Sequence, residues 1–297
     1  MKIILSGSLG HISRPLTQEL VEQGHEVTVI SSKAGKQAEI EALGAKAAIG
    51  SLEDRDFLTQ TFTGADAVYT MVPPANYFDQ ELDLTAYYHR LGNNYAAAIG
   101  ASGVKQVVNL STIGAHLEKG SGILIGAHDV EGILNALPAE VAIVHMRPTS
   151  FFYNLFAHTY SIKNQGRIAA NYGVGDVIPW VSPVDIATAI AEEIGQPFTG
   201  RKIRYVCSEE LSGPQTAAIL STALGKPLEW VLISDEENLA GLVKVGMNPR
   251  IAAGLTEMFA GLHTGLLSED YFAHRPVLGK TKMAVYAGEF AAAINNN

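Results

Sequence analysis

The chain has 297 residues, 47% of them hydrophobic and 17% charged, with a formal net charge of −9. This composition predicts a packed globular protein with a large core and argues against an intrinsically disordered chain. We expect no binding to nucleic acid, which needs clustered Lys and Arg, and no membrane span, which needs roughly twenty consecutive apolar residues.

The amino-terminal stretch, residues 1–33, has the pattern of one βαβ unit. An apolar run at residues 3–5 leads into a turn, residues 7–10, that begins and ends with glycine. A helical pattern follows, and a second apolar run occupies residues 27–30. Such a unit aims the first turn of its helix at a phosphate, because the free N–H groups and the helix dipole favour negative charge there.

The glycine motif within this unit is G-x-x-G-x-x-S, formed by Gly7, Gly10 and Ser13. The glycines allow the main chain to approach a pyrophosphate without a Cβ in the way. Ser13 stands where a third glycine permits close helix–strand packing, so we expect a slightly opened contact there. The alternative interpretation is a βαβ unit with a glycine turn and no ligand.

Strands and helices continue to alternate up to residue 150, which predicts an α/β fold: a Rossmann-like, doubly wound parallel sheet covered on both faces. Further strands are expected at residues 45–49, 67–72, 104–110 and 141–146, and helices at residues 82–101 and 123–137. Ligands of such sheets bind at the carboxyl ends of the strands, near the switch in strand order.

The alternation weakens after residue 150, where glycine and proline punctuate the chain. Short strands at residues 177–181, 203–206 and 228–232 mix with helices, including one at residues 185–194. We therefore predict two domains: a dinucleotide-binding domain of residues 1–150 and a smaller mixed α/β lobe of residues 151–297, with some exchange of chain between them. A lobe packed over the ligand edge would contact the substrate and exclude water.

The end of the second strand bears on the choice of coenzyme. NAD-preferring folds usually place Asp or Glu there to bind the ribose hydroxyls, whereas this chain has Ser31, Ser32 and Lys33. Two hydroxyls and a cation suit a 2′-phosphate, and Lys36 can add a second charge. This predicts NADP(H) in preference to NAD(H). The alternative is a solvated loop whose lysine contacts nothing.

A set of segments in a particular order carries a family resemblance: residues 7–15, 50–54, 103–108, 111–114, 146–155 and 181–187. With these segments the chain resembles the NmrA-like branch of the atypical short-chain dehydrogenase/reductases over nearly its whole length. That branch includes NADPH-dependent quinone and triphenylmethane-dye reductases and cofactor-sensing regulators. The segments are typical of the fold and of coenzyme binding, and much less so of a substrate.

The resemblance implies which residues contact the coenzyme. The glycine turn holds the pyrophosphate, the second-strand end holds the 2′-phosphate, and residues 51–52 lie beside the adenine. Residues 70–73 run along the ribose, and the start of the second lobe lies near the nicotinamide. The residues concerned are Gly7, Ser8, Leu9, Gly10, His11, Ile12, Ser31, Ser32, Lys33, Ser51, Leu52, Thr70, Met71, Val72, Pro73, Ser111, His128, Pro148 and Phe151.

The expected catalytic pair of the larger family is missing. Typical short-chain dehydrogenases use Tyr-x-x-x-Lys, in which the tyrosine protonates the substrate oxygen and the lysine lowers the pKa of that tyrosine. The matching stretch, residues 121–137, contains no such pair; NmrA-like reductases often keep only a lysine, and His128 takes its position here. His128 is a candidate for hydrogen bonding the nicotinamide ribose and for donating a proton. The alternative is a packed or solvated histidine without a role.

Thr112 and Tyr153 are the other catalytic candidates. Thr112 follows the fifth strand, where its hydroxyl can orient substrate or nicotinamide, and Tyr153 lies in an aromatic cluster after the sixth strand. The alternatives are a loop-capping hydroxyl for Thr112 and a core aromatic ring for Tyr153. The nine histidines lack the spacing of metal ligands, so we expect no metal site.

These observations predict an NADPH-dependent oxidoreductase that transfers hydride to a small aromatic or conjugated acceptor such as a quinone. Such an acceptor stabilises the added charge itself, so a site without the tyrosine acid can still reduce it. The alternative is a non-catalytic, NAD(P)-sensing regulator; a sugar-nucleotide epimerase is a weaker third. The single cysteine, Cys207, and the lack of a signal-sequence pattern predict a cytoplasmic protein. The sequence leaves a homodimer open.

Overall fold

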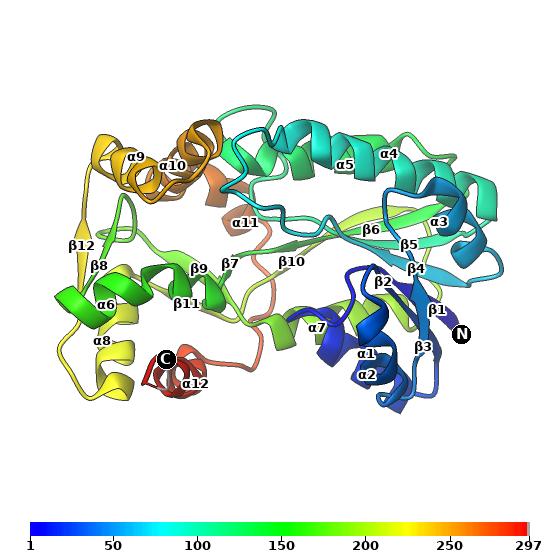
Figure 1. The fold of residues 1–297 in the computed structure, drawn as a ribbon, viewed down its shortest axis with the longest axis horizontal. Helices are drawn as coiled ribbons and strands as arrows, with labels where there is room; N and C mark the ends of the chain where they lie inside the picture. The colour runs from blue at the N-terminus through cyan, green and yellow to red at the C-terminus, as the bar shows by residue number, and fades with distance from the viewer. Residues whose placement is uncertain (296–297) are drawn as a thin grey trace.

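The computed structural model describes residues 1–295, and within them the main feature is a seven-stranded parallel sheet (Figure 1). The strand order across this sheet is β10-β6-β5-β4-β1-β2-β3. Its strands are β1 (Lys2–Leu5), β2 (Glu26–Ser31), β3 (Lys46–Ile49), β4 (Ala67–Thr70), β5 (Gln106–Leu110), β6 (Ala142–Pro148) and β10 (Arg201–Val206). The predicted Rossmann-like, doubly wound sheet is therefore confirmed.

The strand order reverses at β1, which pairs with β2 on one side and with β4 on the other. Ligands of open α/β sheets bind at this switch, outside the carboxyl ends of the strands. The strands near the centre are buried because both faces of the sheet are covered: every residue of β4 and of β6 is buried, including the polar His145 and Arg147 of β6.

Helices cover the two faces of the large sheet, as Figure 1 shows. One face carries α1 (Ser13–Glu22), α2 (Gln37–Glu41) and α7 (Pro183–Ile194), and the other carries α3 (Arg55–Phe62), α4 (Leu84–Ser102) and α5 (Ile125–Asn135). Each face has its own apolar core: Leu16 and Ile190 belong to one, Phe62 and Tyr95 to the other.

A second lobe is built from two small sheets and the remaining helices. One sheet has the order β11-β9-β7, and the other pairs β12 with β8. The strands are β7 (Ser150–Phe151), β8 (Arg167–Ala170), β9 (Ile178–Val181), β11 (Glu209–Leu211) and β12 (Glu229–Leu232). The helices are α6 (Thr159–Gln165), α8 (Gly213–Leu224), α9 (Asp235–Lys244), α10 (Pro249–His263), α11 (Glu269–Ala273) and α12 (Met283–Asn295). Short 3-10 helices lie at Ala34–Lys36, Gly122–Leu124, Phe152–His158 and Leu266–Ser268. The core of this lobe contains Trp180, Trp230 and Phe290.

Two elements that the sequence analysis assigned to the smaller lobe belong to the large sheet instead. Strand β10 pairs in parallel with β6 along its whole length, and α7 packs beside α1. Without β10, the fully buried β6 would present an unpaired edge, which native proteins avoid. Residues beyond 150 therefore contribute a strand and a helix to the large-sheet layer. The division of domains at residue 150 stays a prediction.

Four helices, α3, α6, α11 and α12, were not predicted from the sequence. Helix α3 begins at a regular cap, in which the Asp54 carboxylate accepts a hydrogen bond from the amide of Phe57. Helix α12 is rich in alanine and has little amphipathic pattern, which is why periodicity does not reveal it. In the part of the chain that the structure describes, no helix is long and apolar enough to cross a membrane.

Candidate functional site

The glycine turn after β1 has the conformation and the space of a phosphate-binding loop. Gly7 has a φ of 99°, and Ser8, the one described non-glycine residue with a positive φ, has 55°. A Cβ at Gly7 would lie 3.0 Å from Met71 Sδ and 3.1 Å from Ser13 Oγ. A positive φ and the close approach of the Met71 side chain, just after β4, thus favour glycine at this position.

The start of α1, directly after this turn, is open to an anion. Its N-cap residue is Ile12, and among residues 1–295 no side chain caps the first amides or places a carboxylate in the first turn. Unpaired N–H groups and the positive end of the helix dipole suit a diphosphate. The predicted residues Leu9, Gly10 and His11 are partly to fully exposed beside them. The residues present therefore fit the pyrophosphate of a dinucleotide.

Ser31 has a different position from the one expected of a phosphate donor. Its side chain is buried, and its Oγ accepts hydrogen bonds from Ser8 Oγ at 3.0 Å and from the amide of Lys33 at 3.2 Å. Ser31 therefore links the end of β2 to the glycine turn. Ser32 and Lys33 are exposed and are the members of this trio that point to solvent.

A second cationic residue near this corner, Arg14 in α1, was missed by sequence analysis. Arg14 and Lys36 both form an ion pair with Glu39, and the Lys36–Glu39 distance is 2.6 Å. The three side chains are each about two-fifths exposed. The sequence could have indicated this residue. Arg14 is the second residue of a helix that begins directly after the glycine turn, so its charge lies at the same edge of the sheet.

The adenine side of the site is shaped by the loop after β3. Ser51 is exposed, and its Oγ accepts from the amide of Glu53 at 3.1 Å. Leu52 is partly buried, and Asn94 of α4 donates to the carbonyls of Leu52 and Glu53 at 3.2 Å each. Asn94, another residue not predicted, holds this loop in place.

The end of β4 presents main chain to the ligand edge. Thr70 is buried, and its hydroxyl donates to Asn109 Oδ1 at 3.0 Å, away from the edge. The amide of Met71 donates to Ser6 Oγ at 3.1 Å, and the carbonyl of Met71 accepts from Tyr95 at 2.7 Å. Val72 and Pro73 follow, both partly exposed.

The end of β5 is joined to α5 by a buried hydrogen bond to a carboxylate that is itself paired with an arginine of β6. Ser111 donates through Oγ to Glu131 Oε1 at 2.5 Å, and Arg147 of β6 binds both oxygens of the same carboxylate at 2.9 and 2.7 Å. Arg147 continues to Asp270 of α11 at 3.2 Å. Ser111 is thus held by Glu131 rather than left free, and Glu131 was not predicted from the sequence.

Thr112 and Pro148 lie at the ends of neighbouring strands. The carbonyl of Pro148 accepts from the amide of Ile113 at 2.8 Å, which closes the gap between the two strand ends. Thr112 is partly exposed, and its carbonyl accepts from the amide of Ala115 at 3.3 Å. Thr112 lies in the loop that follows β5, and its role in catalysis stays a prediction.

Tyr153 bridges the two halves of the edge. Its ring stacks on His11 of the glycine turn, with ring centroids 4.7 Å apart, and lies 5.2 Å from the ring of Phe151. Burial raises the pKa of Tyr153 to about 12. The phenol is accordingly a neutral hydrogen-bond donor at neutral pH.

His128 lies in the groove between α4 and α5. Its Nδ1 is 2.9 Å from the carbonyl oxygen of Ala115, so this nitrogen carries the proton and donates. The side chain lines a small cavity of about 350 Å³ together with His89 and Asp129. His128 thus contacts the loop that follows β5, whereas Tyr153 contacts the glycine turn.

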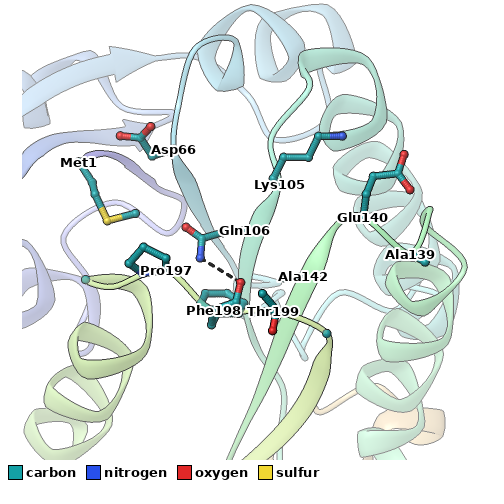
Figure 2. Close-up of a pocket in the computed structure, with 12 residues that line it drawn as sticks. Met1, Asp66, Lys105, Gln106, Ala139, Glu140, Ala142, Pro197, Phe198 and Thr199 are labelled. Atoms are coloured by element: carbon teal, nitrogen blue, oxygen red, sulfur yellow. Dashed lines mark hydrogen bonds between the residues drawn. The ribbon is translucent and has the colours of Figure 1, made fainter.

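A second cavity, of about 820 Å³, lies at the opposite edge of the sheet. Figure 2 shows Met1, Asp66 and Gln106 around it, all at the amino ends of strands. None of the residues that line it is a predicted site residue. Parallel sheets bind ligands at their carboxyl ends, so the cavity is not the coenzyme site. No cluster of three possible metal ligands occurs within residues 1–295.

Comparison with known proteins agrees with this geometry. Residues 7–139 match a family model described as NAD(P)H-binding. The chain is 26% identical over 272 residues to an NAD(P)H azoreductase from Xenophilus azovorans. The aligned region covers 91% of this chain and 89% of that protein.

Two solved reductases share the fold. The NADPH-dependent quinone oxidoreductase from Escherichia coli, solved with NADPH, has a TM-score of 0.80 at 19% identity, covering 97% of this chain and 99% of that one. The triphenylmethane reductase from Citrobacter sp. has a TM-score of 0.76 at 18% identity, covering 99% and 100%. The resemblance predicted from the sequence is thus confirmed for the coenzyme-binding domain and for the fold. Residues 7–139 thus match the NAD(P)H-binding family model, and the whole chain shares the fold of a solved NADPH-dependent quinone oxidoreductase.

Proposed function

We propose that this protein is an NADPH-dependent reductase that transfers hydride to a small conjugated acceptor such as a quinone. The observation that carries the proposal is the uncapped start of α1 behind a glycine turn whose geometry excludes other residues at Gly7. The azoreductase relative supports reduction of a conjugated acceptor.

The proposed coenzyme lies along the carboxyl edge of the large sheet. The turn of residues 7–12 binds the diphosphate, through amides other than that of Ser8, which donates to the carbonyl of Ile30 at 3.0 Å. Lys33 binds the 2′-phosphate, with Ser32 beside it. Ser51 and Leu52 border the adenine, and the main chain of residues 71–73 borders the ribose. When bound, the reduced coenzyme supplies a hydride from its nicotinamide ring. The chain orients that ring against the acceptor between Thr112, Pro148 and Phe151 and excludes water.

The proposed proton donor is the hydroxyl of Tyr153 or that of Thr112. Tyr153 stays protonated at neutral pH, and its position beside His11 places it next to the diphosphate end of the site. A quinone spreads the added charge over its ring, so a hydrogen bond from a neutral hydroxyl suffices during hydride transfer. His128 is retained as a candidate through its Nε2, because its Nδ1 is occupied by Ala115.

A second candidate function is a coenzyme-binding sensor without turnover. The position of His128 favours it, since the side chain lines the groove between α4 and α5 and is held there by a main-chain carbonyl. In this alternative the coenzyme site is the same, and the surface of the loaded protein is what a partner protein recognises.

Coenzyme binding and turnover separate the two functions. We expect calorimetry to show NADPH binding to the purified chain, and oxidation of NADPH with at least one of a p-quinone, an azo dye and a triphenylmethane dye. Gly10→Asp should abolish binding by placing a carboxylate against the diphosphate, whereas Gly10→Ala should bind, since a Cβ there meets its nearest atom at 3.6 Å. Tight binding without turnover on any acceptor favours the sensor, and failure to bind either nucleotide contradicts both.

A further inference from the structure

The loop between β4 and α4, residues 71–83, is attached to both lobes of the protein. Its first residues are held by the large-sheet domain: Met71 by Ser6 and Tyr95, and the carbonyl of Pro73 by Tyr87 at 3.2 Å. Its far half contacts the turn that joins α9 to α10 in the second lobe. There, Gln80 donates through Nε2 to the carbonyl of Gly246 at 3.1 Å.

One buried asparagine makes most of the contacts at the far half. The main-chain amide of Asn248 donates to the carbonyl of Tyr77 at 2.9 Å. Its side-chain Nδ2 lies 3.0, 3.2 and 3.4 Å from the carbonyl oxygens of Asp79, Gln80 and Leu82. Asn248 is only 2% exposed, so water does not replace these contacts.

The side-chain oxygen of Asn248 makes a separate contact. Its Oδ1 accepts from the amide of Arg250 at 2.9 Å and so caps the start of α10. The side chain therefore joins α10 to three carbonyls of the loop. No other residue type supplies an acceptor for the cap and two donors for the carbonyls in the same small volume. Aspartate retains the cap and loses the donors.

The segment held in this way contains Tyr77, whose main-chain carbonyl is one of the groups bound by Asn248. Tyr77 is partly buried, and burial raises its pKa. Its phenol interacts electrostatically with that of Tyr153, which stacks on the glycine turn, and with that of Tyr88 at the start of α4. The next residue, Phe78, is by contrast 53% exposed. Asn248 thus fixes the main chain on both sides of Phe78, through the carbonyls of Tyr77 and Asp79.

We propose that Asn248 is a positioning residue that fixes residues 76–83, and with them the Tyr77 ring, as one wall of the acceptor site. The inference rests on the proposed reductase function. It predicts an effect on the acceptor rather than on the coenzyme, because residues 71–73, which border the ribose, are held independently by Ser6, Tyr95 and Tyr87.

The test compares Asn248→Asp with Asn238→Asp, a matched control on α9 whose Nδ2 bonds to Thr256 and not to the loop. With menadione as the acceptor, we expect Asn248→Asp to raise the acceptor KM about tenfold, the loss expected when buried donors are removed, while kcat changes far less. The Kd for NADPH, measured by calorimetry, should stay within about twofold. Hydrogen exchange in the coenzyme-free protein should become faster at residues 77–82 in Asn248→Asp only.

A second variant separates the ring from the loop. Tyr77→Ala keeps the main-chain carbonyl that Asn248 binds, and should raise the acceptor KM as Asn248→Asp does. In the double variant the acceptor KM should rise by less than the product of the two single-variant increases, because both substitutions act on the same wall. An unchanged acceptor KM in a folded Asn248→Asp protein with faster exchange in the loop overturns the inference. Wild-type protein that binds NADPH and reduces no acceptor contradicts the proposed function instead.

Discussion

Lys33 carries the charge that distinguishes the phosphorylated coenzyme from the unphosphorylated one in the proposed site. It is exposed at the end of β2, and its ammonium forms no ion pair among residues 1–295. Arg14 and Lys36 lie nearby but share the carboxylate of Glu39. In the proposed site, a 2′-phosphate can therefore bind the ammonium of Lys33 directly, whereas it has to compete with the Glu39 carboxylate for the other two cations.

Replacement of Lys33 by Gln should raise the Kd for NADPH about tenfold and leave the Kd for NADH unchanged, since only the former carries the 2′-phosphate. Calorimetric titration with both nucleotides measures this ratio. Lys105→Gln is a suitable control, because Lys105 lies beside the cavity at the opposite edge of the sheet. An equal loss of affinity for both nucleotides would show that Lys33 does not contact the 2′-phosphate.

At the scale of elements, the buried pair Glu131–Arg147 connects α5 with β6, and through Ser111 and Asp270 it reaches β5 and α11. Both side chains of the pair are less than one-tenth exposed. Removing one partner leaves an unpaired buried charge and strongly lowers the free energy of unfolding. Replacing both partners by apolar residues of similar size changes that free energy far less.

Glu131→Leu and Arg147→Leu should each lower the free energy of unfolding by about 3–5 kcal/mol, measured by urea denaturation. The double variant should be clearly more stable than the sum of the two losses predicts, because it contains no unpaired charge. Strictly additive losses would mean that the pair is not coupled as its geometry indicates.

At the scale of the whole molecule, acid stability depends on the core of the second lobe. His158 ends a 3-10 helix there and lies 6.3 Å from the ring of Trp230. Burial lowers its pKa from 6.5 to about 4. The unfolded chain therefore binds a proton at a higher pH than the folded chain does, and protonation between these values favours unfolding.

The free energy of unfolding should fall as the pH is lowered from about 6.5 to about 4, and part of this fall should disappear in His158→Gln. Urea denaturation at a series of pH values measures the slope. His274→Gln serves for comparison, because the side chain of His274 is 68% exposed. If the slope of His158→Gln equals that of the wild type, His158 is not the group responsible.

Local patterns were sufficient for the first half of the fold, while the roles of the predicted site residues stay predictions. The helix starting after Gly10 and the strands at β4 and β5 follow from apolar periodicity and turn residues close together in the chain. Gly7 with its positive φ, and exposed Ser32 and Lys33, lie where the βαβ unit predicts them. These features depend on residues within about one supersecondary unit, whose geometry is nearly constant.

Long-range contacts decided the rest. The pairing of β10 with β6, the ion pair of Arg14 with Glu39 and the hydrogen bonds of Asn248 to the loop at residues 79–82 join residues far apart in the chain. The sequence by itself determined the dinucleotide-type sheet and the edge that binds the coenzyme, because periodicity and turn chemistry are local. Only the tertiary structure decided which side chains enclose the space above that edge, because their positions depend on how two separately built cores pack together.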